Sequence, residues 1–231
     1  MPVNRNDICK LHISKAQILT CIQKALSVGF IDNLRNRHPN VQFDSKLRGY
    51  IGEIAITTWL KKFGIQPEIS NTFDSKSNMD VDLIMTVLGK PQKIEIKTSL
   101  IPDNDKSLIN ALQNRDIKLI KRGNKTISEL ESDVHIQVFF NQIARKKDRW
   151  LLKQSIDFEN PDVESIYYKT AAYRYQKDIF LVGWTHKQAL EILHSPKEMV
   201  WSFKGAQRKF WRCNIAKDAF APITLIPFLK S

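Results

Sequence analysis

The sequence lacks the features that mark several large classes of protein. Its 3 cysteines are an odd number without a CxxC spacing, so they indicate neither a disulfide framework nor a zinc site. No apolar run approaches the roughly 18 residues of a membrane span, and the N-terminus has no apolar signal core. These absences predict a soluble, reduced, cytoplasmic protein without a membrane partner.

Motifs for several kinds of chemistry are missing as well. The chain has no glycine-rich phosphate loop, no Gly-x-Ser-x-Gly and no Cys/His nucleophile pattern, so ATP-driven and acyl-transfer chemistry have no support. Its 8 glycines and 9 prolines are scattered, so no linker is evident. We expect one domain over residues 1–231, with a helical segment at 1–43, a core at 44–141 and further strands and helices at 142–231.

Positive charge, in contrast, is in surplus. The 36 Lys and Arg residues outnumber the 24 Asp and Glu residues, and a net charge of +12 favours a polyanionic partner such as DNA or RNA. Many of the cations gather in a first basic cluster (Lys118, Lys121, Arg122, Lys125), a second (Arg145, Lys146, Lys147, Arg149) and a third (Lys204, Arg208, Lys209, Arg212). One such cluster is typical of a solvated face, but three together indicate phosphate contacts. Trp201, Phe210 and Trp211 accompany the third cluster, where they either stack on bases or belong to the core.

Two helices are predicted near the N-terminus. Ser14 is a suitable cap for a helix over 14–37. Asp44-Ser45 can cap a second helix over 45–63, which Gly64 would end. This second helix is apolar almost all round, a pattern typical of a buried helix.

Glu53 is the exception on that helix. It lies on a narrow polar line, near Lys46 at i−7 and Thr57 at i+4. A carboxylate on a largely buried helix needs a partner, so Glu53 is a candidate functional residue.

The remaining segments predict a mixed α/β fold. Strand-like segments lie at 65–70, 80–88, 92–99, 134–140 and 178–184. Helices are expected at 104–121 and, capped by Thr185, at 186–194.

The second and third of these strands form a predicted hairpin that brings acids together. A type II turn over Val87–Lys90, with a glycine at the third position, sets Asp82 opposite Glu95 and Asp80 opposite Lys97. Opposed Cβ atoms lie about 4.5–5.5 Å apart, so two such carboxylates repel each other unless they share a cation. Mg²⁺ takes oxygen ligands of this kind.

An acid two residues before a lysine is a weak signal by itself. It occurs at Asp44/Lys46, Asp74/Lys76, Glu95/Lys97 and Asp116/Lys118. Only Glu95 and Lys97 lie in an alternating apolar strand that follows a strand headed by an acid. The plainer alternative is a solvated hairpin face, with Glu95 and Lys97 as surface pairs and Glu53 satisfied by Lys46.

The order of Glu53 on a helix, Asp82 on a strand, a turn and then Glu95-Ile96-Lys97 resembles the PD-(D/E)xK phosphodiesterase superfamily. That group includes restriction endonucleases, Holliday-junction resolvases and repair nucleases. The resemblance covers about residues 44–99, with 134–140 as the next core strand. It implies an α/β restriction-endonuclease-like core with a central mixed β-sheet flanked by helices.

One departure concerns the first acid. The family's Pro-Asp is here Val81-Asp82. Asp80 competes with Asp82 for the same role, although Asp82 directly precedes the apolar run, as the family acid tends to do.

The resemblance also implies a role for each matched residue. Asp82 and Glu95 would bind Mg²⁺, with the Ile96 carbonyl as a further ligand and Mn²⁺ able to substitute. Glu53 would hold metal-bound water or a second metal. Lys97 would orient the attacking water and neutralise charge that develops on the scissile phosphate.

We therefore expect a Mg²⁺-dependent endonuclease that hydrolyses double-stranded DNA, in particular a sequence-specific type II restriction enzyme that acts as a homodimer. A junction resolvase or repair nuclease of the same fold is one alternative. A non-catalytic nucleic-acid-binding module is another. DNA contacts are expected from Lys121, Arg122, Lys125, Lys204, Arg208 and Lys209, and His135 and Gln137 share a strand face that can line the cleft.

Overall fold

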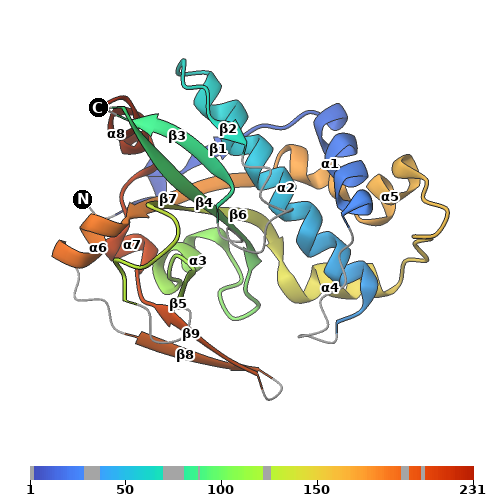
Figure 1. Ribbon diagram of the computed structural model, residues 1–231. Helices are drawn as coiled ribbons and strands as arrows, with labels where there is room; N and C mark the ends of the chain where they lie inside the picture. The colour runs from blue at the N-terminus through green and yellow to red at the C-terminus, as the bar shows by residue number, and fades with distance from the viewer. Residues whose placement is uncertain are drawn as a thin grey trace.

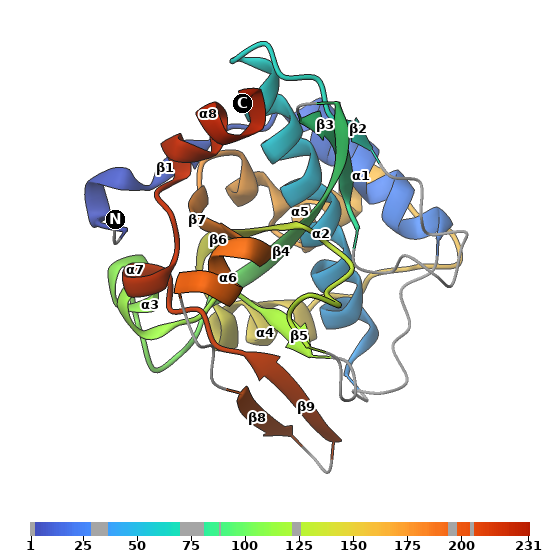
Figure 2. The ribbon, with the colours of Figure 1, turned by 60° about the vertical axis from the view of Figure 1, so that its left-hand side comes forward.

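A mixed β-sheet forms the centre of the protein, and helices lie on both of its faces (Figures 1 and 2). The computed structural model describes residues 3–28, 37–69, 81–87, 89–121, 126–193, 198–203 and 206–231. The predicted α/β class, with a central mixed sheet flanked by helices, is confirmed. None of the described helices is long and apolar enough to cross a membrane.

The central sheet has six strands in the spatial order β1, β7, β6, β4, β3, β2. Their bounds are Cys9–Leu11 (β1), Glu68–Ile69 (β2), Leu83–Val87 (β3), Lys90–Ile101 (β4), Val134–Ile143 (β6) and Ile179–His186 (β7). β4 and β6 are parallel, and the other neighbouring pairs are antiparallel. The predicted strands are confirmed within a few residues, except that the first shrinks to β2. β1 was missed because three residues are too short to show an alternation.

The larger core lies on the face covered by α1 (Lys15–Ser27) and α2 (Pro39–Lys61), with α4 (Ala144–Leu152) and α5 (Val163–Lys169) beside them (Figure 1). Ser14 caps α1 as predicted, because its side chain accepts the N–H of Gln17 at 3.2 Å. α1 ends at Ser27, and residues 29–36 of the predicted helix lie outside the described residues.

α2 begins earlier than predicted. His38 is its cap, since the ring accepts the N–H of Asn40, and Pro39 occupies the first turn, where its missing N–H does no harm. The predicted cap, Asp44, is instead a buried residue inside the helix. Gly64 follows the helix with φ +75°, the left-handed conformation expected there.

The opposite face of the sheet carries a second core. It is covered by α3 (Leu108–Asn114), α6 (Lys187–Leu193), α7 (Ile215–Asp218) and a three-stranded sheet of β5 (Leu119–Lys121), β9 (Ala206–Trp211) and β8 (Glu198–Phe203), in that order (Figure 2). α8 (Leu225–Lys230) contacts β3, and 3-10 turns lie at Arg5–Asp7, Ala172–Gln176 and Pro222–Thr224.

On this side the extent of one predicted helix and the cap of another were wrong. The segment 104–121 divides into α3 and β5, because Leu119–Lys121 pairs with β9 instead of continuing the helix. The helix predicted over 186–194 is confirmed as α6, but Thr185 is not the residue that caps it. His186 takes that part, because its ring accepts the N–H of Ala189 at 3.3 Å.

Candidate functional site

The hairpin of β3 and β4 has the predicted register. Val87 pairs with Lys90, and Leu83 pairs with Ile94. Gly89 has φ +72°, as the third position of a type II turn requires. The turn therefore fixes which residues of the two strands lie side by side.

Asp82 lies where the two strands begin to separate. The last backbone pair of the described hairpin is Leu83 with Ile94, and the N–H of Asp82 donates to the Ile94 carbonyl at 2.9 Å. The Asp82 carboxylate accepts the N–H of Ile96 at 2.5 Å. This differs from the predicted pairing of Asp82 with Glu95. The Ile96 N–H donates to the Asp82 carboxylate and not to a backbone carbonyl of the neighbouring strand. Asp82 is thus bound to the backbone between the two candidate residues of β4.

Glu95 is a buried carboxylate with a partner on each oxygen. It is 4% exposed, with Oε1 ion-paired to Nζ of Lys97 and Oε2 2.9 Å from Nδ1 of His135. Burial alone would raise the pKa of Glu95, but the hydrogen bond with His135 and the charge of Lys97 outweigh it, and the pKa is lowered. Glu95 is therefore an ionised group inside the protein, and a solvated surface pair does not describe it.

β6 contributes two residues, His135 and Gln137, that the sequence placed only on a common strand face. Its parallel pairing with β4 places His135 beside Glu95 and Gln137 beside Lys97. The Gln137 amide donates to the Lys97 carbonyl at 3.0 Å and to Oγ of Ser99 at 3.1 Å. Both β6 residues are buried, so they contact the candidate site from within the sheet and do not line an open cleft.

α2 approaches β4 very closely at Gly52, the residue before Glu53. A Cβ atom on Gly52 would lie 2.4 Å from Cγ2 of Thr98. Because side chains alternate along a strand, Thr98 lies on the face opposite Glu95 and Lys97. α2 therefore covers the other face of β4, and Glu53 approaches the hairpin from that side.

Glu53 and Asp82 influence each other electrostatically. Burial raises the pKa of Glu53 to about 7 and the charge of Asp82 adds to this, while Lys24 and Lys46 act in the opposite direction. Nζ of Lys24 lies 3.9 Å from Glu53 Oε2, a partner that the sequence did not indicate. The expected partner, Lys46, lowers the pKa of Glu53 through its positive charge. A buried acid whose neighbour opposes its ionisation is a place where a cation would be stabilising.

The described residues hold no group of three or more His, Cys, Asp or Glu side chains arranged for a metal ion. Asp80, the competitor of Asp82, lies outside them. The chemistry of the donors still suits Mg²⁺, which usually takes one or two carboxylates and otherwise water and substrate phosphate. Asp82 and Glu95 offer such carboxylates, whereas Glu53 approaches from the other face of β4 and influences Asp82 through its charge.

The fold brings parts of the first and third basic clusters together. β5 pairs with β9 so that Lys121 lies opposite Lys209 in the backbone register. The Lys209 side chain is exposed. Arg122, Lys125 and Lys204 lie outside the described residues, as do the side chains of Lys121, Arg208 and Trp201. Trp211 packs against the second core, which favours a structural role for that aromatic residue.

The second basic cluster is less uniform than the sequence suggested. Arg145, Lys146 and Arg149 are exposed on α4. Lys147 is buried, and its Nζ lies 3.2 Å from Oδ1 of Asp44. Lys147 is therefore part of a buried ion pair and is not available to phosphate.

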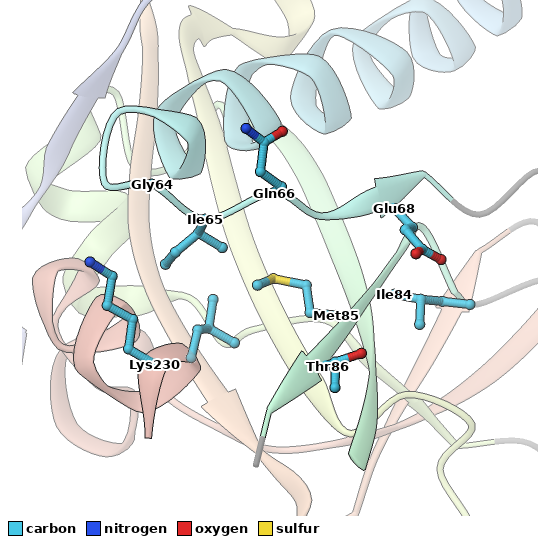
Figure 3. Close-up of a pocket in the computed structure, with 9 residues that line it drawn as sticks. Gly64, Ile65, Gln66, Glu68, Ile84, Met85, Thr86 and Lys230 are labelled. Atoms are coloured by element: carbon cyan, nitrogen blue, oxygen red, sulfur yellow. The ribbon is translucent and has the colours of Figure 1, made fainter. Parts of the chain in front are cut away.

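A cavity of about 300 Å³ lies beside β2 and β3. It is lined by Gly64, Ile65, Gln66, Glu68, Ile84, Met85, Thr86, Leu229 and Lys230. Figure 3 shows it between β3 and α8, with Met85 and Ile65 directed into the same space. It includes none of the residues matched to the nuclease pattern, and it indicates no particular ligand.

Comparison of the chain with protein-family models, with curated proteins and with solved structures gave no match. These comparisons therefore assign neither a family nor an activity. The candidate site is defined by the geometry of its own residues: a hairpin with Asp82, Glu95 and Lys97, and a helix with Glu53.

Proposed function

We propose that the protein is a Mg²⁺-dependent DNA endonuclease of the PD-(D/E)xK type with a restriction-endonuclease-like core. The supporting observation is the placement of three residues on one hairpin. The buried Glu95 forms an ion pair with the half-buried Lys97, and Asp82 binds the backbone N–H between them. The elements α2, β3, β4 and β6 follow one another in the order on which the resemblance rests.

Each residue then has a chemical task. Asp82 and Glu95 would hold Mg²⁺ through carboxylate oxygens, with the Ile96 carbonyl as a further ligand and Mn²⁺ as a substitute. A bound ion of this kind polarises the phosphate and lowers the pKa of a water molecule. Lys97 brings an ammonium group to the same place, where it stabilises negative charge developing on the phosphate. Glu53, with a pKa of about 7, can hold or release a proton beside Asp82 near neutral pH.

The basic residues support duplex DNA as the substrate. A net charge of +12 attracts a polyanion, and the pairing of Lys121 with Lys209 joins two basic clusters on one small sheet. Contacts to phosphate position a duplex without reading its sequence. Lys121, Arg122, Lys125, Lys204, Arg208 and Lys209 remain the proposed contact residues.

Within this class we favour a type II restriction enzyme that acts as a homodimer. The smaller sheet, together with α3, α6 and α7, extends beyond the hairpin core and offers elements that can read bases. A junction resolvase or repair nuclease would use the same catalytic residues. A non-catalytic binding module would need only the basic surface, and it would not require a carboxylate as deeply buried as Glu95 beside the half-buried Lys97.

Digestion of a large unmethylated DNA with Mg²⁺ tests the proposal. Discrete fragments would support a restriction enzyme, and a smear would support a general nuclease. Preferential cutting of branched DNA would support a resolvase. A protein that leaves linear and branched DNA intact with both Mg²⁺ and Mn²⁺ is not a nuclease.

A further inference from the structure

A buried histidine holds the Glu95 carboxylate from the neighbouring strand. His135 is 1% exposed, and its Nδ1 lies 2.9 Å from Oε2 of Glu95. An ionised carboxylate can only accept hydrogen bonds, so Nδ1 carries the hydrogen and donates it.

The other ring nitrogen argues against a purely structural role for His135. Nε2 is buried and finds no hydrogen-bond partner in the part of the chain that the structure describes. A buried polar atom without a partner destabilises a fold, and an apolar side chain would fill the same space without that penalty. The contact with Glu95 is therefore the interaction that explains a histidine at this position.

The surrounding strands fix this contact. β4 and β6 are parallel neighbours with His135 beside Glu95, and Gln137 anchors the Lys97 carbonyl two residues along. The ring therefore cannot move along the strand relative to the carboxylate. Its hydrogen bond leaves the second oxygen of Glu95, Oε1, on the side of Lys97.

We propose that His135 is a positioning residue that orients the Glu95 carboxylate for metal binding. This inference rests on the proposed function, which makes Glu95 a metal ligand. Groups that hydrogen-bond to a ligating side chain set its orientation, and their loss typically weakens metal binding about 10- to 100-fold.

The test is a Mn²⁺ titration of wild type and three variants. Electron paramagnetic resonance measures the concentration of free Mn²⁺ at each step. His135→Leu removes the donor. His135→Asn keeps an N–H close to the position of Nδ1, whereas the longer side chain of His135→Gln does not. We expect the Leu and Gln variants to bind Mn²⁺ about ten-fold or more weakly, and the Asn variant to bind within a few-fold of wild type.

His186→Leu is the matched control for losing a partly buried histidine. The His186 ring stacks on Phe220 and Phe228 and accepts the N–H of Ala189. This variant should lower the melting temperature and leave Mn²⁺ affinity unchanged.

The outcomes separate this inference from the proposed function. If folded His135→Leu binds Mn²⁺ as wild type does while wild type cleaves DNA, His135 is not a positioning residue and the nuclease proposal stands. If His135→Leu does not fold, equal affinities of the Asn and Gln variants overturn the inference. A wild type that neither binds Mn²⁺ nor cleaves DNA overturns both.

Discussion

Gly52 and Thr98 set the distance between α2 and the central sheet, because a Cβ atom on Gly52 would lie 2.4 Å from Cγ2 of Thr98. The next residue, Glu53, is a candidate catalytic acid. The absence of a side chain at position 52 therefore lets α2 come close enough for Glu53 to interact with the hairpin.

Gly52→Ala should destabilise the protein, even though alanine is the better helix former. Overpacking of this kind typically costs about 1–3 kcal/mol. Gly49→Ala on the same helix is the control, because nothing lies within 4 Å of its added Cβ. It should stabilise by about 0.5–1 kcal/mol. Urea unfolding measures both, and Thr98→Ser should restore stability to Gly52→Ala because serine lacks Cγ2. Equal stability of the two alanine variants would contradict the close packing.

Glu53→Gln should alter how stability depends on pH. The pKa of Glu53 is raised from 4.5 to about 7, so the folded protein holds this proton more tightly than the unfolded chain does. As pH rises from about 4.5 to about 7, the free energy of unfolding of wild type should therefore fall relative to that of the variant, by on the order of 3 kcal/mol. Above about pH 7 the difference should stay constant.

Urea unfolding in EDTA at pH 4.5, 6 and 8 measures this difference. Adding Mg²⁺ at pH 8 should reduce it, because a cation offsets the charge on Glu53. A difference that does not change with pH would show that Glu53 ionises as an exposed carboxylate does.

Asp44→Asn should be strongly destabilising, although Asp44 lies outside the candidate site. Its carboxylate accepts from Tyr175 at 2.6 Å and pairs with Arg48 at 2.9 Å and with Lys147 at 3.2 Å. Removing one partner from a buried ion pair typically costs about 3–5 kcal/mol, because the remaining charges stay buried. Glu164→Gln, which breaks an exposed pair with Lys15, should have little effect. Similar midpoints of urea unfolding for the two variants would refute this prediction.

Much of the candidate hairpin could be predicted from local sequence. Gly89 marked the turn, and the turn fixed the register of β3 and β4. The alternation along β4 correctly placed Glu95 and Lys97 on one face. Asp82 was predicted less well, because its side chain replaces a backbone acceptor and ends the pairing.

Contacts between distant segments could not be predicted in the same way. The parallel register that places His135 beside Glu95 joins strands about 40 residues apart, and no turn defines it. Lys24 reaches Glu53 from another helix. Asp44 was predicted to be a helix cap because aspartate serves both as a capping residue and as a member of buried ion pairs. Only the residues that contact it distinguish these two roles.

Lys209→Ala should weaken DNA binding for all sequences to a similar degree. Each phosphate contact contributes about one unit to the slope of log affinity against log salt concentration, so the slope should fall by about one. Lys61→Ala is the control, because Lys61 is an exposed residue in the last turn of α2. That end of α2 lies far from β8 and β9 in both views (Figures 1 and 2). Fluorescence anisotropy at several salt concentrations gives both slopes. Equal slopes would remove Lys209 from the DNA-binding surface.

The most direct test of the nuclease proposal compares cleavage and binding in one pair of variants. Lys97→Ala and Glu95→Ala remove groups that we propose act at the scissile phosphate, and they leave the basic surface intact. We predict that wild type cleaves DNA with Mg²⁺, that both variants lose cleavage by at least about 100-fold, and that all three bind DNA similarly in EDTA. Wild-type cleavage rates in the two folded variants, or no cleavage by wild type with any divalent cation, would contradict the proposal.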